Sequence, residues 1–163
     1  MHGQAIVYET LDRLGIVCEG MDHEAAYTVE DMERLPFPSD VVIAKNLFLR
    51  DAKGRRHFLV TAATDRKIDV RALQEVLAST RLSFGSTERL ARYLGVEQGS
   101  VSPLCILNDV EASVEVFFDP ALRRCGRVGV HPNDNRATLF LAFADLEKVV
   151  REHGNPLGYL PER

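Results

Sequence analysis

The sequence predicts an α+β fold, in which a mixed, mainly antiparallel sheet has helices packed around it. Residues 41–49 and 57–63 are rich in β-branched and aromatic residues and flank a turn at residues 51–54, which is typical of a hairpin. Helical patterns occur singly elsewhere, without the regular strand–helix alternation of a doubly wound fold. The length of 163 residues predicts one domain, spanning residues 1–163.

The first part of the chain predicts two helices and a short strand. Apolar residues at helical spacing indicate a helix over residues 4–14 that ends at Gly15. Residues 16–18 are apolar and predict a short strand. Thr28 begins a capping-box pattern, which predicts a short helix that ends before Pro36.

Residues 41–49 predict an interior strand, because both of its alternating faces are mostly apolar. Lys45 lies in the middle of this strand, where a lysine is unusual, since its charge is costly to bury without a partner. Two alternatives follow. Either the side chain extends so that its ammonium group stays in water, or it points into a cleft where acidic or carbonyl groups meet it.

The middle of the chain predicts two capped helices. Asp69 is suited to cap the first helix, and Ser86 to cap the second, which ends at Gly95. Residues 82–84 between them predict a short extended piece. The inner face of the first helix is predicted to consist of Val70, Leu73, Val76 and Leu77.

The last part of the chain predicts more strands and a final helix. Residues 104–107 and 113–118 predict two strands around a turn at Asn108. Asp119 and the proline after it predict a single helical turn. The remaining elements are predicted to be a loop, a strand and a helix at residues 129–135, 137–143 and 144–153.

The composition indicates a cytoplasmic protein without a membrane segment. No apolar stretch approaches the roughly 20 residues that a membrane span needs, and the N-terminus shows no signal-peptide pattern. Cys18, Cys105 and Cys125 are odd in number and widely spaced, so reduced thiols are expected rather than disulfides or a zinc site.

The charge is uneven along the chain. The formal net charge is −4, which argues against a surface that coats nucleic acid broadly. Residues 1–44 have a net charge of −7, whereas residues 45–99 contain eleven basic and six acidic residues, a net of +5. The basic residues suit either limited contact with the phosphates at one end of a polyanion or an ordinary solvated surface. Those singled out are Lys53, Arg55, Arg56, Arg66, Lys67, Arg89 and Arg92.

The stretch from Gly99 to Pro103 predicts a tight turn between a helix and the following segment. Glycine permits unusual dihedral angles, and proline makes the residue before it extended. Such a turn can direct several main-chain N–H groups at one point, as a developing oxyanion or a ribose oxygen requires. Ser100 and Ser102 add hydroxyl groups. The same pattern also fits a turn with no function.

The loop from His131 to Asn135 places an imidazole, two amides and a carboxylate within five residues. Loops on a rigid scaffold often contain binding residues, although Asn and Asp also favour turns for local reasons. His131 could polarise a carbonyl, orient a water or donate to a ribose hydroxyl. The five histidines show no metal-ligand spacing, and no nucleophile elbow, Walker loop or dinucleotide motif is present, so neither a metal nor a cofactor is expected.

Four stretches together, in this order, resemble the YbaK/prolyl-tRNA-synthetase-associated editing family, and within it the freestanding alanyl-tRNA(Pro) deacylases. The resemblance covers essentially the whole chain. The stretches are Ala44–Leu49, Leu82–Gly85, Gly99–Leu104 and His131–Thr138.

The resemblance implies a hydrolase that cleaves the ester between a wrong amino acid and tRNA(Pro). Its partner would be the acceptor end of tRNA(Pro) carrying alanine, and possible docking on prolyl-tRNA synthetase is implied as well. The family's lysine, its glycine-to-proline loop and its histidine match Lys45, Gly99–Pro103 and His131. The implied catalytic residues are Lys45, Gly99, Ser100 and His131. The implied substrate-binding residues are Asn46, Val101, Ser102, Pro103, Asn133 and Asn135.

Two alternatives to this function stay open at the level of sequence. The same chemistry could act on another charged tRNA, such as cysteinyl-tRNA(Pro) or a seryl-tRNA. A noncatalytic module that binds a tRNA end or a synthetase belongs to a different class. The combination of Lys45, Gly99–Pro103 and His131 favours the enzyme, since a binding module would not need all of them.

Overall fold

The computed structural model describes residues 3–163, and an eight-stranded mixed sheet lies at its centre. The strands are β1 (Glu19–Asp22), β2 (Val41–Arg50), β3 (His57–Ala63), β4 (Ser83–Phe84), β5 (Glu115–Phe118), β6 (Arg127–Val130), β7 (Ala137–Ala142) and β8 (Leu157–Tyr159). The α-helices are α1 (Ala5–Arg13), α2 (Val29–Glu33), α3 (Val70–Val76), α4 (Thr87–Leu94) and α5 (Phe143–His153). Two 3₁₀ helices are η1 (Pro103–Asn108) and η2 (Pro120–Arg124).

The strands follow the order β1-β7-β6-β2-β3-β5-β8, and β4 pairs with β2 outside this path. Four of the seven strand pairings are antiparallel, namely β1–β7, β7–β6, β2–β3 and β2–β4. The other three pairings, β2–β6, β3–β5 and β5–β8, are parallel. The predicted hairpin of β2 and β3 and the predicted mixed, mainly antiparallel α+β class are both confirmed.

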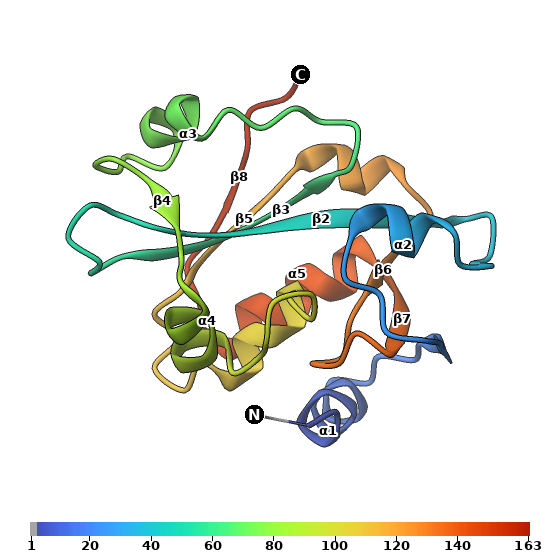
Figure 1. Cartoon of the computed structure of the whole chain (residues 1–163). Coiled ribbons are helices and arrows are strands. Elements are labelled where there is room, and N and C mark those ends of the chain that lie inside the picture. The colour runs from blue at the N-terminus through green and yellow to red at the C-terminus, as the bar shows by residue number, and fades with distance from the viewer. Residues whose placement is uncertain (1–2) are drawn as a thin grey trace.

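Helices cover both faces of the sheet. Figure 1 shows α3 on the opposite side of β2 from α4 and α5. Side chains along β2 alternate accordingly, because successive strand residues point to opposite faces. Ala44 and Phe48 pack in the larger apolar cluster, with α1, α4, η1 and α5, whereas Leu47 and Leu49 pack in a smaller cluster with α3.

The predicted helix caps are confirmed. The Thr28 hydroxyl accepts a hydrogen bond from the Asp31 N–H at the start of α2, and the Ser86 hydroxyl accepts one from the Arg89 N–H at the start of α4. The Asp69 carboxylate accepts bonds from two amides of α3. Gly95 follows α4 with φ +65°, a left-handed conformation that glycine adopts without strain.

Two predicted strands are wrong. Residues 16–18 do not join the sheet, because the Ile16 N–H donates to the Leu11 carbonyl and completes the end of α1. The strand β1 begins only at Glu19. Residues 104–107 lie in the 3₁₀ helix η1, which Ser102 caps. Their unbroken apolar run reflects complete burial, which fits a strand and a buried helix equally well.

Three smaller differences concern the edges of elements. Val76 was predicted on the inner face of α3 but is exposed, while Leu73 and Leu77 face the core. The predicted loop at residues 129–135 is wrong at its start, since Gly129 and Val130 belong to β6. The short strand β8 was not predicted. No helix within residues 3–163 has the length and apolar character that a membrane crossing requires.

Candidate functional site

The site lies where β2 loses its strand partner along one edge. On this edge, Val41–Ile43 pair with β6 and Leu49–Arg50 pair with β4. Within the described residues, 44–47 have no strand partner on that edge. On the opposite edge, β2 pairs with β3 continuously from Ala44 to Arg50. The result is a gap in the sheet beside a strand that is otherwise firmly held.

Main-chain polar groups of β2 face this gap. The Gly85 N–H donates to the Phe48 carbonyl at 2.9 Å on the β4 side, which fixes the direction of the Phe48 main-chain groups. Main-chain groups of residues two apart in a strand point to the same edge. The N–H and C=O groups of Asn46 therefore face the gap and can bind a ligand there.

A cavity of about 230 Å³ occupies the gap. β2, the loop after α4, the end of β6 and the segment at the start of α2 form its walls. The apolar lining includes Ala26, Val29, Met32, Ile43 and Val130. Of the predicted site residues, the cavity brings together Lys45, Asn46, Gly99, Val101 and His131. Ser100, Ser102, Pro103, Asn133 and Asn135 do not line it.

Lys45 lines the cavity and bonds a main-chain carbonyl next to it. Its ammonium group donates a hydrogen bond to the carbonyl of Arg66, in the loop after β3, and the side chain is half-buried. This is the second of the two alternatives that the sequence left open. An ammonium group has three N–H donors, so two remain for a ligand in the cavity.

The side chain of Asn46 braces the cavity wall. Its Nδ2 donates to the Val101 carbonyl at 3.2 Å, and its Oδ1 accepts a hydrogen bond from the Thr61 hydroxyl at 2.7 Å. These bonds hold the Gly99–Pro103 loop against the β2–β3 hairpin. Asn46 therefore offers its main chain to the cavity, while its side chain fixes the position of the loop.

Gly99 needs to be glycine for two reasons. Its φ is +96°, which side chains of L-residues rarely permit, and an added Cβ would lie 3.2 Å from Cδ1 of Tyr27.

The Ser100 and Ser102 amides donate within the protein, to the Glu97 carbonyl and the Cys105 thiol. For the amides of Gly99 and Val101, the structure of residues 3–163 records no acceptor. These two amides are therefore the loop's candidate oxyanion donors.

The two serines and the proline of the Gly99–Pro103 loop do not line the cavity and instead hold the loop in place. Ser102 is completely buried, and its hydroxyl donates to the His131 carbonyl at 2.7 Å while accepting from the Leu104 N–H at 3.2 Å. Pro103 begins η1, and Ser100 is buried behind the loop. The Ser102 hydroxyl thus connects the Gly99–Pro103 loop to the His131–Asn135 loop, so a substitution of Ser102 would displace both loops.

His131 lines the cavity in a defined tautomer. Its Nδ1 lies 2.8 Å from the Ala137 carbonyl, so in the neutral ring Nδ1 holds the proton and Nε2 is an acceptor. Burial lowers the pKa of His131, and the nearby His23 lowers it further, whereas the Ala137 carbonyl and Asp134 act in the opposite direction. The imidazole is therefore set up to be neutral and to accept a hydrogen bond through Nε2.

The two asparagines of the histidine loop hold the chain in place. Asn133 has φ +64°, donates to the Gly3 carbonyl and accepts from the Asn108 amide. The side-chain amide of Asn135 donates to the Ala26 carbonyl at 3.0 Å, and the main-chain carbonyl of Asn135 accepts from the Ala26 N–H. These two bonds fix the segment around Ala26, which lines the cavity. Within residues 3–163, no group of three His, Cys, Asp or Glu side chains is placed to hold a metal ion.

Sequence reasoning missed the wall formed by residues 26–32. Val29 and Met32 of α2 line the cavity, and Tyr27 before the helix is 68% exposed although its ring contacts Gly99. Only the exposed tyrosine in a polar loop offered a signal. The apolar residues of α2 look like those of any short helix.

Several of the basic residues singled out in the sequence have internal partners. Arg56 pairs with Glu115 at 2.9 Å, and Arg66 pairs with the buried Asp119 at 3.0 Å. Arg89 lies 3.0 Å from Nε2 of His57 and donates to the Gly54 carbonyl. In the described part of the chain, no salt bridge is recorded for Lys53, Arg55, Lys67 or Arg92, which remain available to a polyanion.

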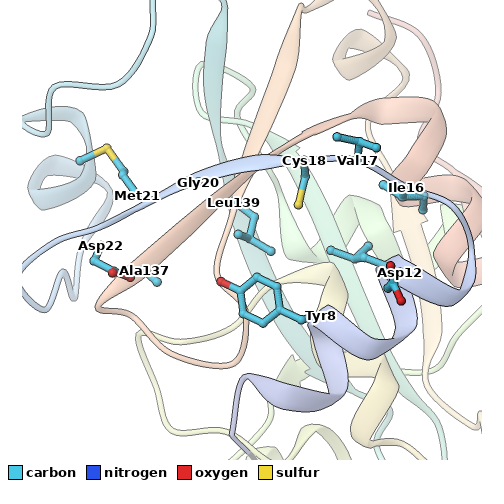
Figure 2. A pocket seen from close by; sticks show the side chains of 11 residues that line it. Tyr8, Asp12, Ile16, Val17, Cys18, Gly20, Met21, Asp22, Ala137 and Leu139 are labelled. Carbon is cyan, nitrogen blue, oxygen red and sulfur yellow. The ribbon is translucent and has the colours of Figure 1, made fainter.

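A larger hollow of about 490 Å³ lies between α1 and β1, and none of the predicted site residues lines it. Figure 2 shows Tyr8 of α1 facing Leu139 of β7 there, with Cys18 nearby. Asp12 and Asp22 line the hollow, and none of its described lining residues is basic. Burial raises the pKa of the Cys18 thiol, and Asp145 raises it further, so this thiol is not activated. The hollow is unsuited to a phosphate-bearing ligand.

Comparison with known proteins decides the family. A model of the aminoacyl-tRNA editing domain matches residues 23–149, which include every predicted site residue. The chain belongs to this family. Membership places it among the aminoacyl-tRNA hydrolases, the enzyme class that the sequence predicted.

Two relatives and one solved structure illustrate the match. The prolyl-tRNA editing protein ProX of Acetoanaerobium sticklandii is 48% identical over 155 residues, which are 95% of this chain and 94% of the relative. The prolyl-tRNA synthetase associated domain-containing protein 1 of Danio rerio is 36% identical, over 88% of this chain and 79% of the relative. A crystal structure of a candidate trans-editing enzyme for prolyl-tRNA synthetase aligns with a TM-score of 0.74 at 17% identity, over 98% of this chain and 97% of that one. This last similarity supports the fold alone.

Proposed function

We propose that the chain is a trans-editing deacylase that hydrolyses alanyl-tRNA(Pro) to free alanine and tRNA(Pro), within one domain and in the cytoplasm. The observation that supports this most is the small cavity with an apolar wall at which Lys45, His131 and unpaired main-chain amides meet. A synthetase built for proline cannot exclude a smaller apolar amino acid by size, so a second, smaller pocket is needed to remove the error.

The reaction needs positioning more than a strong nucleophile, because an aminoacyl ester is already reactive. Water attacks the ester carbonyl carbon, and the carbonyl oxygen becomes an oxyanion. The bond to the ribose oxygen then breaks, and this oxygen takes up the proton that the water gives up, which leaves free alanine and a ribose hydroxyl. The amides of Gly99 and Val101, with that of Asn46, stabilise the oxyanion, since fixed donors need no reorganisation. Lys45 holds the ester carbonyl or the ribose with its two remaining donors. A hydroxyl of the substrate's ribose is the proposed water-orienting group.

His131 binds the amino acid in this proposal. The free ammonium group of the alanyl ester is a donor, and Nε2 of neutral His131 is an acceptor. A protonated imidazole would repel the ammonium group, so the lowered pKa of His131 serves the function directly. The remaining predicted site residues hold the two loops in position relative to each other. These are Ser100, Ser102, Pro103, Asn133 and Asn135.

The apolar wall supports alanine as the amino acid removed. Ala26, Val29 and Ile43 offer no hydrogen bond from their side chains to a serine hydroxyl, which would lose its bonds to water on entry. Cysteine is less polar and is the nearer competitor. The acceptor stem would approach across Lys53, Arg55 and Arg92, and docking on prolyl-tRNA synthetase would raise the local concentration of mischarged tRNA.

The deciding experiment incubates the purified protein with alanyl-, cysteinyl-, seryl- and prolyl-tRNA(Pro) and follows loss of each ester. Rapid loss of alanine with proline spared is expected. Faster loss of cysteine or serine would replace alanine in the proposal while keeping the chemistry. If all four esters survive at the rate of the uncatalysed reaction, the deacylase proposal is wrong, and RNA binding without hydrolysis would identify a binding module.

A further inference from the structure

The cavity beside Lys45 continues into a second hollow of about 260 Å³. Asn46, Gln98 and Val101 line both spaces, so the two form one trough along the open edge of β2. Residues of β4 and of the start of α4 line the far end of the trough, and Figure 1 shows the chain passing from β4 to α4 across one end of β2. The proposed chemistry uses only the first space and leaves the second unassigned.

Phe84 forms the far end of this trough. The residue lines the second hollow and is 61% exposed. Single exposed apolar residues are common and need no explanation on their own. Phe84 differs because it sits at the wall of a hollow that opens into the candidate active site. It pairs with Leu49 in the short strand β4, so the sheet fixes its main chain.

The residue after Phe84 shows how closely β4 approaches the trough. A Cβ added to Gly85 would lie 2.4 Å from Cδ2 of Phe48, so no other residue could hold this close approach without displacing the Phe48 ring. The Gly85 N–H also donates to the Phe48 carbonyl. Phe48 and Phe84 therefore border the same hollow from opposite faces of the sheet, on main chains that strand pairing fixes, which limits the entropy lost when a ligand binds.

Gln98 supplies a polar group at the junction of the two spaces. It is exposed, and within residues 3–163 no hydrogen bond is recorded for its carboxamide. A glutamine carboxamide can pair with both N6 and N7 of adenine. Aromatic side chains bind nucleobases by stacking, independently of strand pairing. A flat apolar wall with one free carboxamide thus fits a purine.

We propose that this second hollow binds the terminal adenine of the charged tRNA, with Phe84 as a stacking platform and Gln98 as the group that contacts the base edge. The inference rests on the proposed function, because the ester must lie at Lys45. Phe84 is opposite Leu49, three residues along β2 from Asn46, a span of about 10 Å. A nucleoside lying along the open edge joins the two spaces, with its ribose beside Asn46.

The first test compares hydrolysis of alanyl-tRNA(Pro) by wild-type protein, Phe84→Ala and Phe84→Tyr. Loss of base stacking predicts that Phe84→Ala raises KM about tenfold with a smaller change in kcat, whereas Phe84→Tyr stays within about twofold of wild type. Val110→Ala is the matched control, since Val110 is 90% exposed and lies outside the trough. An unchanged KM for Phe84→Ala overturns the proposal.

A second arm varies the substrate. Alanyl-tRNA(Pro) that lacks the base of its terminal nucleotide should be a poor substrate for the wild type, and Phe84→Ala should no longer distinguish it from the normal substrate. If the wild type cleaves both substrates equally well, the adenine site is wrong and the deacylase proposal stands. If the wild type cleaves neither, the deacylase proposal is wrong.

A third arm tests the base site without hydrolysis. Adenosine 5′-monophosphate should shift the backbone amide resonances of Phe84, Gly85 and Gln98 in the wild type, and these shifts should be lost in Phe84→Ala. Cytidine 5′-monophosphate should shift them less, because its single ring stacks less and does not present N6 and N7. Equal shifts with both nucleotides, or none with either, contradict an adenine site even if esters are cleaved.

Discussion

Two hollows of the protein, the one between α1 and β1 and the cavity beside β2, differ in the residues that border them. The hollow measures about 490 Å³, roughly twice the 230 Å³ of the cavity. Asp12 and Asp22 line the hollow, whereas Lys45 and His131 line the cavity. An ester attached to a polyanion needs cations and N–H donors around it. Volume alone would have selected the wrong place.

The two spaces also differ in how they arise. The hollow forms because a surface helix packs beside β1, the edge strand of the sheet. The cavity forms because the central strand β2 changes partners from β6 to β4 along one edge, where residues 44–47 have no strand partner among the described residues. Donors on a central strand are held firmly by the remaining sheet, and fixed donors are what transition-state stabilisation requires.

Replacing Lys45 should have the largest effect. We expect Lys45→Ala to lower kcat/KM for alanyl-tRNA(Pro) about 100- to 1000-fold, the range found when an oxyanion-stabilising donor is removed. The half-buried side chain makes one hydrogen bond to a main-chain carbonyl, so thermal unfolding should change little. Single-turnover hydrolysis and a melting curve measure the two quantities.

Lys148→Ala is the control for this change. Lys148 also donates from its ammonium group to a main-chain carbonyl, that of Leu14 at the end of α1, at 2.9 Å. It belongs to α5 and lies outside the cavity, so its loss should leave the rate unchanged. A similar loss of activity in both variants would mean that the rate responds to general charge and not to the site beside β2.

Replacing His131 should have the next largest effect and a pH signature. We expect His131→Ala to lower kcat/KM about 10- to 100-fold, the value of a hydrogen bond to a charged group, whereas His153→Ala, at the far end of α5, should not. Because burial lowers the pKa of His131, the wild-type rate should be maintained to a lower pH than an unperturbed imidazole would allow. A rate that already halves between pH 7.5 and 6.5 in parallel with an unperturbed imidazole would contradict the proposed role.

The same shift has a consequence for folding. A histidine with a lowered pKa in the folded state is neutral there while the unfolded chain already binds a proton. Its contribution is therefore unfavourable to folding below about pH 6.5 and absent above it. Stability should fall on acidification in the wild type and fall less steeply in His131→Ala.

Gly99 lines the cavity, and Gly15 offers a control position outside it that also has a positive φ. Both have positive φ, +96° and +70°, so an alanine should cost each about 1–2 kcal/mol of stability. A Cβ on Gly99 meets Tyr27, whereas a Cβ on Gly15 meets nothing within 4 Å. Gly99→Ala should therefore also lower kcat/KM about tenfold by moving the cavity wall, and Gly15→Ala should not. Equal activities at matched stability would remove Gly99 from the site.

The sequence predicted the elements that local chemistry determines. The caps at Thr28, Asp69 and Ser86 need only neighbouring residues, and all three form as predicted. The wrong strand at residues 104–107 has a different cause. Complete burial makes every residue apolar, so the periodicity that separates a strand from a helix is lost, and the cap at Ser102 decides the outcome.

The same distinction applies to the site. Lys45 could be predicted because a lysine is unusual within an apolar strand, whereas Gly99 and His131 were predicted through the family resemblance, and the structure gathers all three at one cavity. Val29 and Met32 could not be, because their role depends on α2 lying against the gap, which only the tertiary fold specifies. The gap itself follows from the pairing of β6 and β4 with β2, a long-range property that no local pattern shows.

The smallest predicted effect comes from the larger hollow. Asp12→Asn together with Asp22→Asn removes two negative charges from the acidic part of the chain and touches no residue of the cavity. Long-range repulsion of the tRNA should weaken slightly, so kcat/KM should rise by about twofold at low salt and return to the wild-type value above the physiological ionic strength. Measurement of kcat/KM against salt concentration tests this. A salt-independent fall in rate would show that the hollow takes part in the reaction, and the distinction between the two spaces would then be wrong.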